Sequence, residues 1–456
     1  MGHVLPPART SPQKQHPMRK PQRTERGSLP SAAILTLGCS KNVVDSENLA
    51  AYLRSHGVQL VDIDRAETLI INTCGFIDTA KQESIHAILQ AIEWKRAGRS
   101  RRLVVAGCLS ARHAEELRRE LPEVDYFFGT EPYEPIVRLF ANDFRYELLG
   151  ERELSTPRHY AYLKLSEGCD HPCSFCAIPL MRGRYRSRPM ESLISEAYRL
   201  AERGVRELIL IAQDTTYYGV DLYGKRRICD LVEALGQIPG ISWIRLLYTY
   251  PAHFPEELLD TMVEHPTVCR YIDLPLQHVS TPVLTSMRRG ITRRTIERLL
   301  ETIRNRVPGV TLRTTFIVGY PNETEERFAE LYDFVHQARF DRMGVFPYSH
   351  EEGTAAWILG DPIPPEVKQH RLQALMELQR SISRELNSAK IGSRLCVLVD
   401  EYLSPGEYRG RTEGDAPEVD NDVFLHSEHP LEVGTFATVL IEDATDYELY
   451  GTAVAT

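Results

Sequence analysis

AAILTLGC, residues 32–39, is the stretch that decides the fold of the first part of the chain: an apolar run that ends in glycine and cysteine. A helical pattern follows it. The same unit returns as TLIINTCG at 68–75 and as RLVVAGC at 102–108, each again followed by a helical pattern. Strands that alternate with helices predict a parallel sheet with helices on its faces. We therefore expect an N-terminal α/β domain over residues 31–145.

Each of these three strands runs into a cysteine, namely Cys39, Cys74 and Cys108, which lie 35 and 34 residues apart. Ligands of open α/β sheets bind beyond the carboxyl ends of the strands, so the three thiols can converge there. Buried cysteine is also common at strand ends for packing alone. Its recurrence at the same place in three units, each time beside a glycine, favours a shared ligand site.

A second alternating series predicts a further domain over residues 158–387. Its six expected strands lie within residues 160–169, 206–214, 242–251, 269–278, 310–321 and 342–353. Six strands in this length suit a βα barrel that is open or incomplete, rather than the complete eight-fold one. Its active site should lie at the carboxyl ends of the strands.

The two ends of the chain differ from this pattern. Short β-branched and aromatic runs broken by Gly, Pro and Asp predict a small all-β barrel over residues 389–456. Residues 1–30 are rich in Pro, Arg, Lys and Gln and poor in aliphatic residues, which predicts a disordered basic tail. The fold class is thus α/β multidomain: a parallel α/β domain, a partial (βα)6 barrel and a small all-β barrel.

Composition limits the chemistry. Nine cysteines in 456 residues are far below the ~8–10% of a disulfide scaffold. No apolar run of ~18 residues or more predicts a membrane span, and no secretory signal is present. We expect a cytoplasmic protein with reduced thiols and no membrane partner.

EGCDHPCSFC, residues 167–176, follows the first expected strand of the barrel and holds Cys169, Cys173 and Cys176. A structural zinc takes four protein ligands, and His171 inside the same short loop is badly placed to close a tetrahedron. Three thiolates suit a 4Fe-4S cluster with one iron left open for a small molecule. Zinc stays possible on spacing alone.

The pattern CDHPCSFC, with Phe175 before the last cysteine, resembles the signature of radical S-adenosylmethionine (SAM) enzymes. That resemblance implies a 4Fe-4S cluster that binds SAM and cleaves it by one-electron reduction. It also implies weaker cofactor positions at Phe175, Gly319 and Tyr348, although a glycine after a strand is also ordinary turn chemistry. A fourth weak position is Gln213, which ends the second expected strand of the barrel, a place suited to polar contacts with cofactor or substrate. At Gln213 and the adjacent Asp214, a loop cap is almost as good an interpretation.

The whole chain from residue 31 onward resembles the methylthiotransferase branch of that superfamily, which has an N-terminal α/β domain, a radical SAM barrel and a TRAM-like β-barrel. The motifs TLGCSKNVVDSE, INTCGFI and VAGCLS match the places where this branch holds a second, auxiliary 4Fe-4S cluster. The resemblance therefore implies Cys39, Cys74 and Cys108 as its ligands. The other cysteines, Cys229, Cys269 and Cys396, have no motif around them and are expected in the core.

Methylthiotransferases act on transfer RNA adenosines or, in the RimO type, on the β-carbon of an aspartate in the twelfth small-subunit ribosomal protein. Residues 389–456 hold four basic and fourteen acidic residues. Such a domain would repel RNA and suit a basic protein, although acidic residues also simply solubilise a domain. AQDTTYYGVDLYGK, PLQHVS and VFPYSHEEGT also resemble the RimO type. We expect an acidic docking surface that includes Glu413, Asp415, Glu418, Asp420 and Asp422.

The RimO type is therefore the predicted function, with a one-electron donor such as flavodoxin or ferredoxin as a second partner and no direct RNA binding. The alternative is a MiaB-like transfer RNA adenosine methylthiotransferase. A remote alternative from another class is a non-catalytic zinc- or RNA-binding adaptor. That adaptor predicts cysteines in fours and a basic C-terminal barrel, and the sequence has neither.

Overall fold

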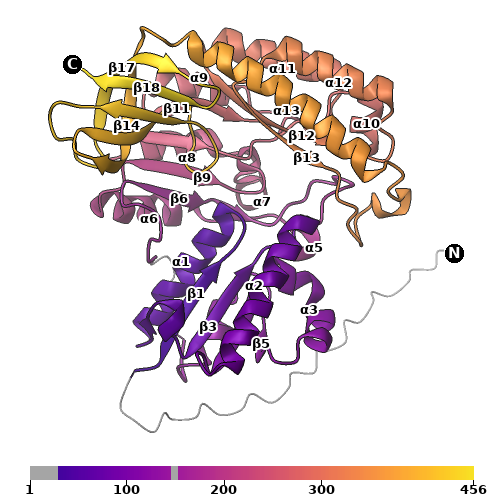
Figure 1. Cartoon of the computed structure of the whole chain (residues 1–456), viewed down its shortest axis with the longest axis vertical. Coiled ribbons are helices and arrows are strands. Elements are labelled where there is room, and N and C mark those ends of the chain that lie inside the picture. Colours follow the sequence, from indigo (N-terminus) through magenta and orange to yellow (C-terminus); the bar gives the residue numbers. More distant parts are fainter. Residues whose placement is uncertain (1–28, 145–151, 456) are drawn as a thin grey trace.

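The structure, a computed structural model, describes residues 29–144 and 152–455, and it has an α/β domain below a larger upper part (Figure 1). Most of the predicted basic tail, residues 1–28, lies outside the described residues. Within the described ranges, no helix is long and apolar enough to cross a membrane.

The N-terminal domain contains a five-stranded parallel sheet in the order β2-β1-β3-β4-β5. Its strands are β1 (Ser31–Thr36), β2 (Gln59–Leu60), β3 (Thr68–Thr73), β4 (Arg102–Gly107) and β5 (Tyr126–Phe127). Its helices are α1 (Ser40–Ser55), η1 (Ile63–Arg65), α2 (Asp78–Arg96), α3 (Cys108–Glu120) and α4 (Tyr133–Val137). Strand β3 is buried along its whole length because separate apolar clusters cover the two faces of the sheet.

The middle domain is an open six-stranded parallel sheet in the order β13-β12-β11-β10-β9-β6, which confirms the predicted partial barrel. Its strands are β6 (Tyr160–Lys164), β9 (Glu207–Ile211), β10 (Trp243–Leu246), β11 (Val268–Asp273), β12 (Thr311–Val318) and β13 (Arg342–Pro347). The short strands β7 (Ser166–Glu167) and β8 (Arg186–Ser187) form an antiparallel pair on either side of the cysteine loop.

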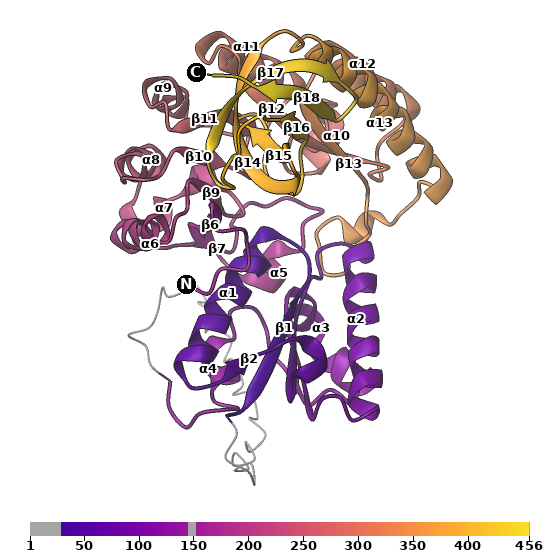
Figure 2. The same ribbon diagram turned by 60° about the vertical axis from the view of Figure 1, so that its left-hand side comes forward.

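Helices cover the outer face of this sheet in an arc, and the large apolar core lies between them (Figure 2). They are α6 (Met190–Glu202), α8 (Ile228–Gly236), α9 (Glu257–Glu264), α11 (Arg293–Arg306), α12 (Glu325–Ala338) and α13 (Pro365–Ser388). Shorter helices are α5 (Ile178–Arg182), η3 (Thr215–Tyr217), α7 (Val220–Tyr223), α10 (Thr281–Ser286) and η4 (Trp357–Leu359).

The C-terminal domain is a closed five-stranded barrel in the order β14-β15-β16-β18-β17. Its strands are β14 (Arg394–Ser404), β15 (Glu407–Thr412), β16 (Asp422–His426), β17 (Phe436–Ala444) and β18 (Glu448–Ala453). The predicted all-β barrel is confirmed, although β15, with the sequence EYRGRT, has too few apolar residues to be recognised from sequence.

This small barrel sits inside the arc of the middle domain (Figure 2). Leu398, Ala416 and Phe436 pack against Trp243 and Tyr271 of the inward face of the open sheet. The open sheet therefore has apolar contacts on its concave side as well as on its helical side.

The three cysteines without a motif differ in their surroundings. Cys269 is 1% exposed in the inner cluster, and Cys229 packs partly buried against the main core. Cys396 is exposed on β14, so its predicted place in the core was wrong. The alternation of β14 turns Val397 inward and leaves its neighbour Cys396 outside.

Candidate active site

Cys39, Cys74 and Cys108 lie at the carboxyl ends of β1, β3 and β4, which are neighbours in the sheet. Cys39 is the N-cap residue of α1, and Cys108 is the first residue of α3. Gly38, at φ +90°, approaches Cys74 so closely that a Cβ there would lie 2.9 Å from its Sγ. The glycines beside the cysteines therefore let the loops meet, as the sequence pattern predicted.

The chemistry of this first trio fits a metal cluster. All three thiols are free. Burial raises the pKa of Cys74, and it raises the pKa of Cys108 to about 12; the neighbouring thiols add to both effects, whereas the Arg182 guanidinium opposes them. A bound metal removes such protons outright, because coordination favours the thiolate. Soft sulfur donors select iron-sulfur clusters or zinc over hard cations.

Asn42 joins the loops that carry this trio. Its Nδ2 donates to the carbonyls of Leu37, at 2.7 Å, and Thr73, at 3.1 Å, which lie just before the first two cysteines. Its Oδ1 accepts a hydrogen bond from Arg182 at 2.6 Å. One side chain of α1 thus ties two cysteine loops to helix α5 of the neighbouring domain.

Cys169, Cys173 and Cys176 lie in the loop between β7 and α5. Arg289 Nη1 donates to the Cys173 Sγ at 3.4 Å, and the Tyr250 hydroxyl lies 3.6 Å from the same sulfur. Burial raises the pKa of Cys169 and of Cys176 to about 12 each. Three free thiols beside a buried guanidinium suit an anionic cluster for the same reasons as at the first trio.

His171 has other partners within this loop. Its Nε2 lies 2.7 Å from the Oδ2 of Asp214, and its ring stacks on Tyr250 with centroids 3.7 Å apart. Asp214 also caps η3 by accepting from the N–H groups of Thr216 and Tyr217, so the loop-cap interpretation of that residue is confirmed. A histidine held in this way is badly placed to be the fourth ligand of a zinc ion.

The four weaker cofactor positions have different surroundings. Phe175 packs with Tyr320 and Tyr348 in a small apolar cluster, and the Tyr348 hydroxyl is buried without a hydrogen-bond partner among the described residues. Gln213 follows β9, and its Oε1 is likewise buried and unpaired. These polar atoms remain available to a ligand.

Gly319 has a structural explanation of its own. Its φ is +76°, and a Cβ there would lie 2.3 Å from Cγ of Lys368, a residue of α13. Its N–H donates to the buried carboxylate of Glu323. The close approach of α13 therefore explains this glycine without a ligand.

Sequence reasoning did not single out Arg289, Tyr250 or Gln277. Arg289 and Tyr250 reach the second cysteine trio from loops far along the chain, so no local motif marks them. Gln277 has φ +74° and a buried Oε1 without a partner in the described part of the chain. Its place in PLQHVS was the available signal, because that stretch resembles the RimO type.

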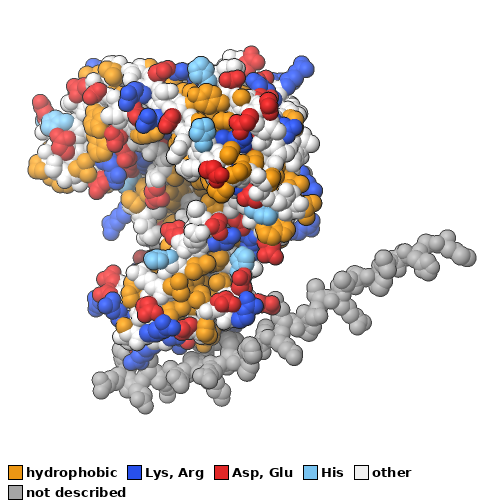
Figure 3. All heavy atoms as spheres, turned by 45° about the vertical axis from the view of Figure 1, so that its right-hand side comes forward, with side chains coloured by type: hydrophobic (Ala, Val, Ile, Leu, Met, Phe, Trp, Pro, Cys, Tyr) orange, Lys and Arg blue, Asp and Glu red, His pale blue; other side chains and the backbone are white. Residues whose placement is uncertain are grey.

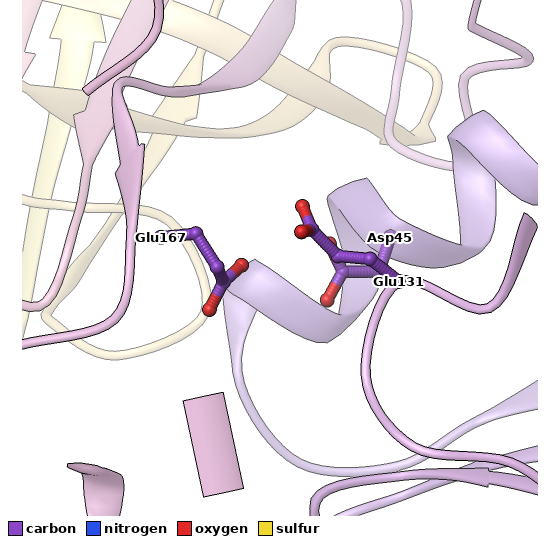
Figure 4. A group of neighbouring side chains, drawn as sticks. All are labelled: Asp45, Glu131 and Glu167. Carbon is purple, nitrogen blue, oxygen red and sulfur yellow. The ribbon is translucent and has the colours of Figure 1, made fainter. Parts of the chain in front are cut away.

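Three carboxylates, of Asp45, Glu131 and Glu167, converge where the N-terminal domain meets the barrel (Figure 4). The Lys164 ammonium donates to all three, and so it takes the place that a cation would have. Arg182 also contacts Asp45 and Glu167. Burial alone would raise the pKa of Glu167, but Lys164 and Arg182 hold it down at about 2.

This ion cluster fixes the two cysteine trios relative to each other. Asp45 lies six residues after Cys39 on α1, and Glu167 lies two residues before Cys169. Both carboxylates are buried and share the same two cations. The interface therefore ties the two cysteine loops together through shared ion pairs.

The C-terminal domain corrects one prediction. Asp415 is 1% exposed and pairs with Arg342 at 2.5 Å, and the Asp420 side chain is buried beside Arg313. The loop that carries them faces the concave side of the open sheet. The prediction that Asp415 and Asp420 belong to a surface that docks a basic partner was wrong, because internal arginines already neutralise them.

The other three acidic residues of the predicted docking surface, Glu413, Glu418 and Asp422, have different surroundings. Glu418 accepts hydrogen bonds from the hydroxyls of Tyr160 and Tyr162, and the Glu413 carbonyl accepts one from Arg245. Asp422 lies 3.4 Å from Arg409. Glu413 and Glu418 are nevertheless exposed, and the other exposed acidic residues of the domain are Glu401, Glu407, Glu428, Glu432, Glu442 and Asp443.

Comparison with known families divides the chain as the structure does. Residues 31–129 match a family described as uncharacterized protein family UPF0004, residues 163–335 match the radical SAM superfamily, and residues 391–454 match the TRAM domain. Among solved structures, the radical SAM methyltransferase TsrM from Kitasatospora setae, solved with cobalamin and a [4Fe-4S] cluster bound, aligns with a TM-score of 0.53. That alignment covers 84% of this chain and 81% of TsrM at 14% identity, and it shows the fold alone.

Two curated relatives are much more similar. The ribosomal protein uS12 methylthiotransferase RimO of Chloroherpeton thalassium is 52% identical over 426 residues, which cover 92% of this chain and 98% of the relative. The RimO of Cytophaga hutchinsonii is 51% identical over 425 residues, covering 92% and 97%. The chain thus belongs to the RimO family of radical SAM methylthiotransferases.

Proposed function

We propose that this chain transfers a methylthio group to the β-carbon of an aspartate in ribosomal protein uS12, the twelfth protein of the small subunit. The observation that carries the proposal is the pair of three-cysteine sites held together by one buried ion cluster. A single cluster site would serve SAM cleavage alone, whereas two sites facing a common interface suit a reaction that also needs a sulfur site.

Each trio would hold one 4Fe-4S cluster, through Cys39, Cys74 and Cys108 in one case and Cys169, Cys173 and Cys176 in the other. When bound, these groups supply the electron that cleaves SAM and the site from which sulfur is delivered. The protein positions them through Asn42, Arg182 and the carboxylates around Lys164. Arg289 donates to a thiol of the second trio and so stabilises negative charge there.

Phe175, Tyr348 and Gln213 are the residues that we propose for contact with SAM. Phe175 and Tyr348 belong to the same apolar cluster, and Phe175 directly precedes the proposed ligand Cys176. The unpaired oxygens of Tyr348 and Gln213 would find hydrogen-bond donors on a polar cofactor. Gly319 keeps a structural role in this proposal.

The substrate and partners follow from the same family. A ribosomal protein is basic, and the exposed charge of the C-terminal barrel is mainly acidic, which supports association with uS12 in the cytoplasm. The same charge disfavours direct RNA binding and therefore a MiaB-like activity. The cleavage of SAM needs a one-electron donor, for which flavodoxin or ferredoxin would serve.

The test combines metal analysis with product analysis. Anaerobically reconstituted enzyme should hold about eight irons per chain with matching sulfide. Replacing either trio by alanine should leave about half of the iron and abolish product. The product is measured by mass spectrometry of purified uS12 after incubation with enzyme, SAM and a reductant. One zinc and no iron, or unmodified uS12 with fully loaded enzyme, would contradict the proposal.

A further inference from the structure

Lys41 is a buried lysine whose charge has no anionic partner among residues 29–144 and 152–455. Lys41 is 6% exposed. Within the described ranges its ammonium contacts only the ring of Tyr248, with the Nζ 3.1 Å from the ring centroid. Several other buried cations of the chain pair with carboxylates, as Arg245 does with Glu207 and Arg342 with Asp415, whereas the buried Arg289 donates to the Cys173 sulfur of the second trio. Since a buried charge without a counter-charge is costly, the surroundings of Lys41 favour the binding of an anionic group.

The position of Lys41 adds to this cost. It is the second residue of α1, a helix of sixteen residues with no acidic residue in its first turn. The amino end of a helix carries partial positive charge and so disfavours a lysine. Helix stability therefore does not explain the residue, whereas the same local field would strengthen the binding of an anion.

Tyr248, whose ring contacts Lys41, has an unusual backbone conformation. Tyr248 has φ +60°, in the left-handed region that is unfavourable for a residue with a side chain. The Asp273 carboxylate fixes it by accepting from its N–H at 2.8 Å, and the Tyr248 hydroxyl lies 3.5 Å from that of Ser40. Two unfavourable features, an unpaired cation and a strained backbone, thus meet at one contact between the domains.

This contact lies at the mouth of the barrel. Val43 and Val44, which follow Lys41, pack with Ile211 and Leu247 at the carboxyl ends of β9 and β10. Lys41 is also two residues from Cys39. The space-filling view shows the surface hollowed between the lower N-terminal domain and the upper part of the molecule (Figure 3). An anion bound to Lys41 would therefore lie between the first cysteine trio and the barrel mouth.

We propose that Lys41 is the counter-ion of the side-chain carboxylate of the substrate aspartate. The inference rests on the proposed function and deepens it, because it names the residue of the enzyme that recognises the aspartate to be modified. The aromatic ring contacts one side of the ammonium, whose three N–H groups leave donors free for a carboxylate. A lone lysine repels the basic side chains of a ribosomal protein and so selects the acidic one. Tyr248 positions the ammonium.

The test is equilibrium binding of labelled uS12 to the reconstituted enzyme, read by fluorescence anisotropy. The second ligand is the uS12 variant in which asparagine replaces the aspartate that the enzyme modifies. A charge-assisted hydrogen bond is worth about 1.5–3 kcal/mol, so the wild-type enzyme should bind the aspartate form at least about 10-fold more tightly. Lys41→Met and Lys41→Gln should bind both forms equally, and Lys41→Arg should keep part of the preference.

Lys95→Met is the matched control. It removes a lysine of the same domain that pairs with Asp125 near the far end of α2, about 25 Å along the helix from its cysteine end. It should keep the full preference for the aspartate form. Equal binding of both forms by the wild-type enzyme would overturn the inference, and so would an undiminished preference in Lys41→Met and Lys41→Gln.

The two proposals fail in different ways. If the enzyme does not modify uS12, the wild-type reaction gives no methylthio-aspartate, and the proposed function fails. If only the assignment of Lys41 is wrong, the wild-type product is still formed. The Lys41 variants then weaken the binding of the aspartate and asparagine forms by the same factor, as loss of a purely interdomain contact would.

Discussion

Asp415→Asn tests whether the acidic loop of the C-terminal barrel is an internal contact. The Asp415 carboxylate accepts hydrogen bonds from Arg342 at 3.1 and 2.5 Å and from the Thr412 hydroxyl at 2.5 Å. Asparagine keeps the shape but removes the charge and turns an amide toward a donor. Because removing one partner leaves the other charge buried, we expect a loss of about 3–5 kcal/mol in the free energy of unfolding.

The pH dependence of this loss has a definite sign. Burial alone would raise the pKa of Asp415, but Arg342 and Lys390 hold it below the ordinary value of 3.8. A carboxyl with a lowered pKa stabilises the fold above that value and loses its contribution as pH falls below it. The difference in stability between wild type and Asp415→Asn should therefore be full at neutral pH and shrink below about pH 4.

The assay is denaturant unfolding, combined with hydrogen exchange of β13 and of the loop before β16. Replacing both partners, as in Arg342→Leu with Asp415→Leu, should cost less than the sum of the single changes, since no charge is left unpaired. Glu428→Gln, at an exposed site, is the control and should change stability by less than about 0.5 kcal/mol. The reasoning is refuted if Asp415→Asn leaves stability unchanged and instead weakens binding to uS12.

Three further outcomes are expected. Gly168→Ala should displace the second cysteine loop and reduce its iron loading, measured by the visible absorbance of the reconstituted enzyme, because φ is +75° and the new Cβ would lie 2.1 Å from the Arg184 carbonyl oxygen. Lys164→Met should leave the buried carboxylates of Asp45 and Glu167 to Arg182 alone and raise hydrogen exchange in α1 and α5 as the domains loosen. Charge reversal of exposed acidic residues should slow association with uS12, most strongly at 0.1 M salt, where the Debye length is about 10 Å, and least at 1 M, where it is about 3 Å. The residues to reverse are Glu428, Glu432, Glu442 and Asp443.

The architecture could be predicted because its signals are local. The predicted strands of the two parallel sheets are mainly apolar runs between turn residues, and the loops that carry the cysteines follow directly from them. The two-residue strands β2 and β5, at the edges of the N-terminal sheet, are too short to give such a signal and were not predicted. Strand β15 was missed because Arg409 and Arg411 interrupt its apolar pattern. Arg411 is nevertheless buried, since Glu207 and Asp400 neutralise it.

The composition of the C-terminal domain could not show which of its carboxylates are exposed and which are buried. The count of acidic residues in the last domain is correct, but a count does not say which carboxylates face an internal arginine. Asp415 and Asp420 are neutralised by Arg342 and Arg313, residues some seventy and more positions earlier in the chain. Arg289 contacts Cys173 and Lys41 contacts Tyr248, and each pair is also far apart in sequence. These contacts could therefore be seen only in the folded chain.

Mass spectrometry of ribosomal protein uS12 from cells with and without this gene tests the central claim most directly. With the gene, one aspartate of uS12 should carry a methylthio group on its β-carbon, and without the gene that aspartate should be unmodified. Digested transfer RNA from the same cells should be the same in both. A methylthio group that is lost from an adenosine, with uS12 unchanged, would contradict the account.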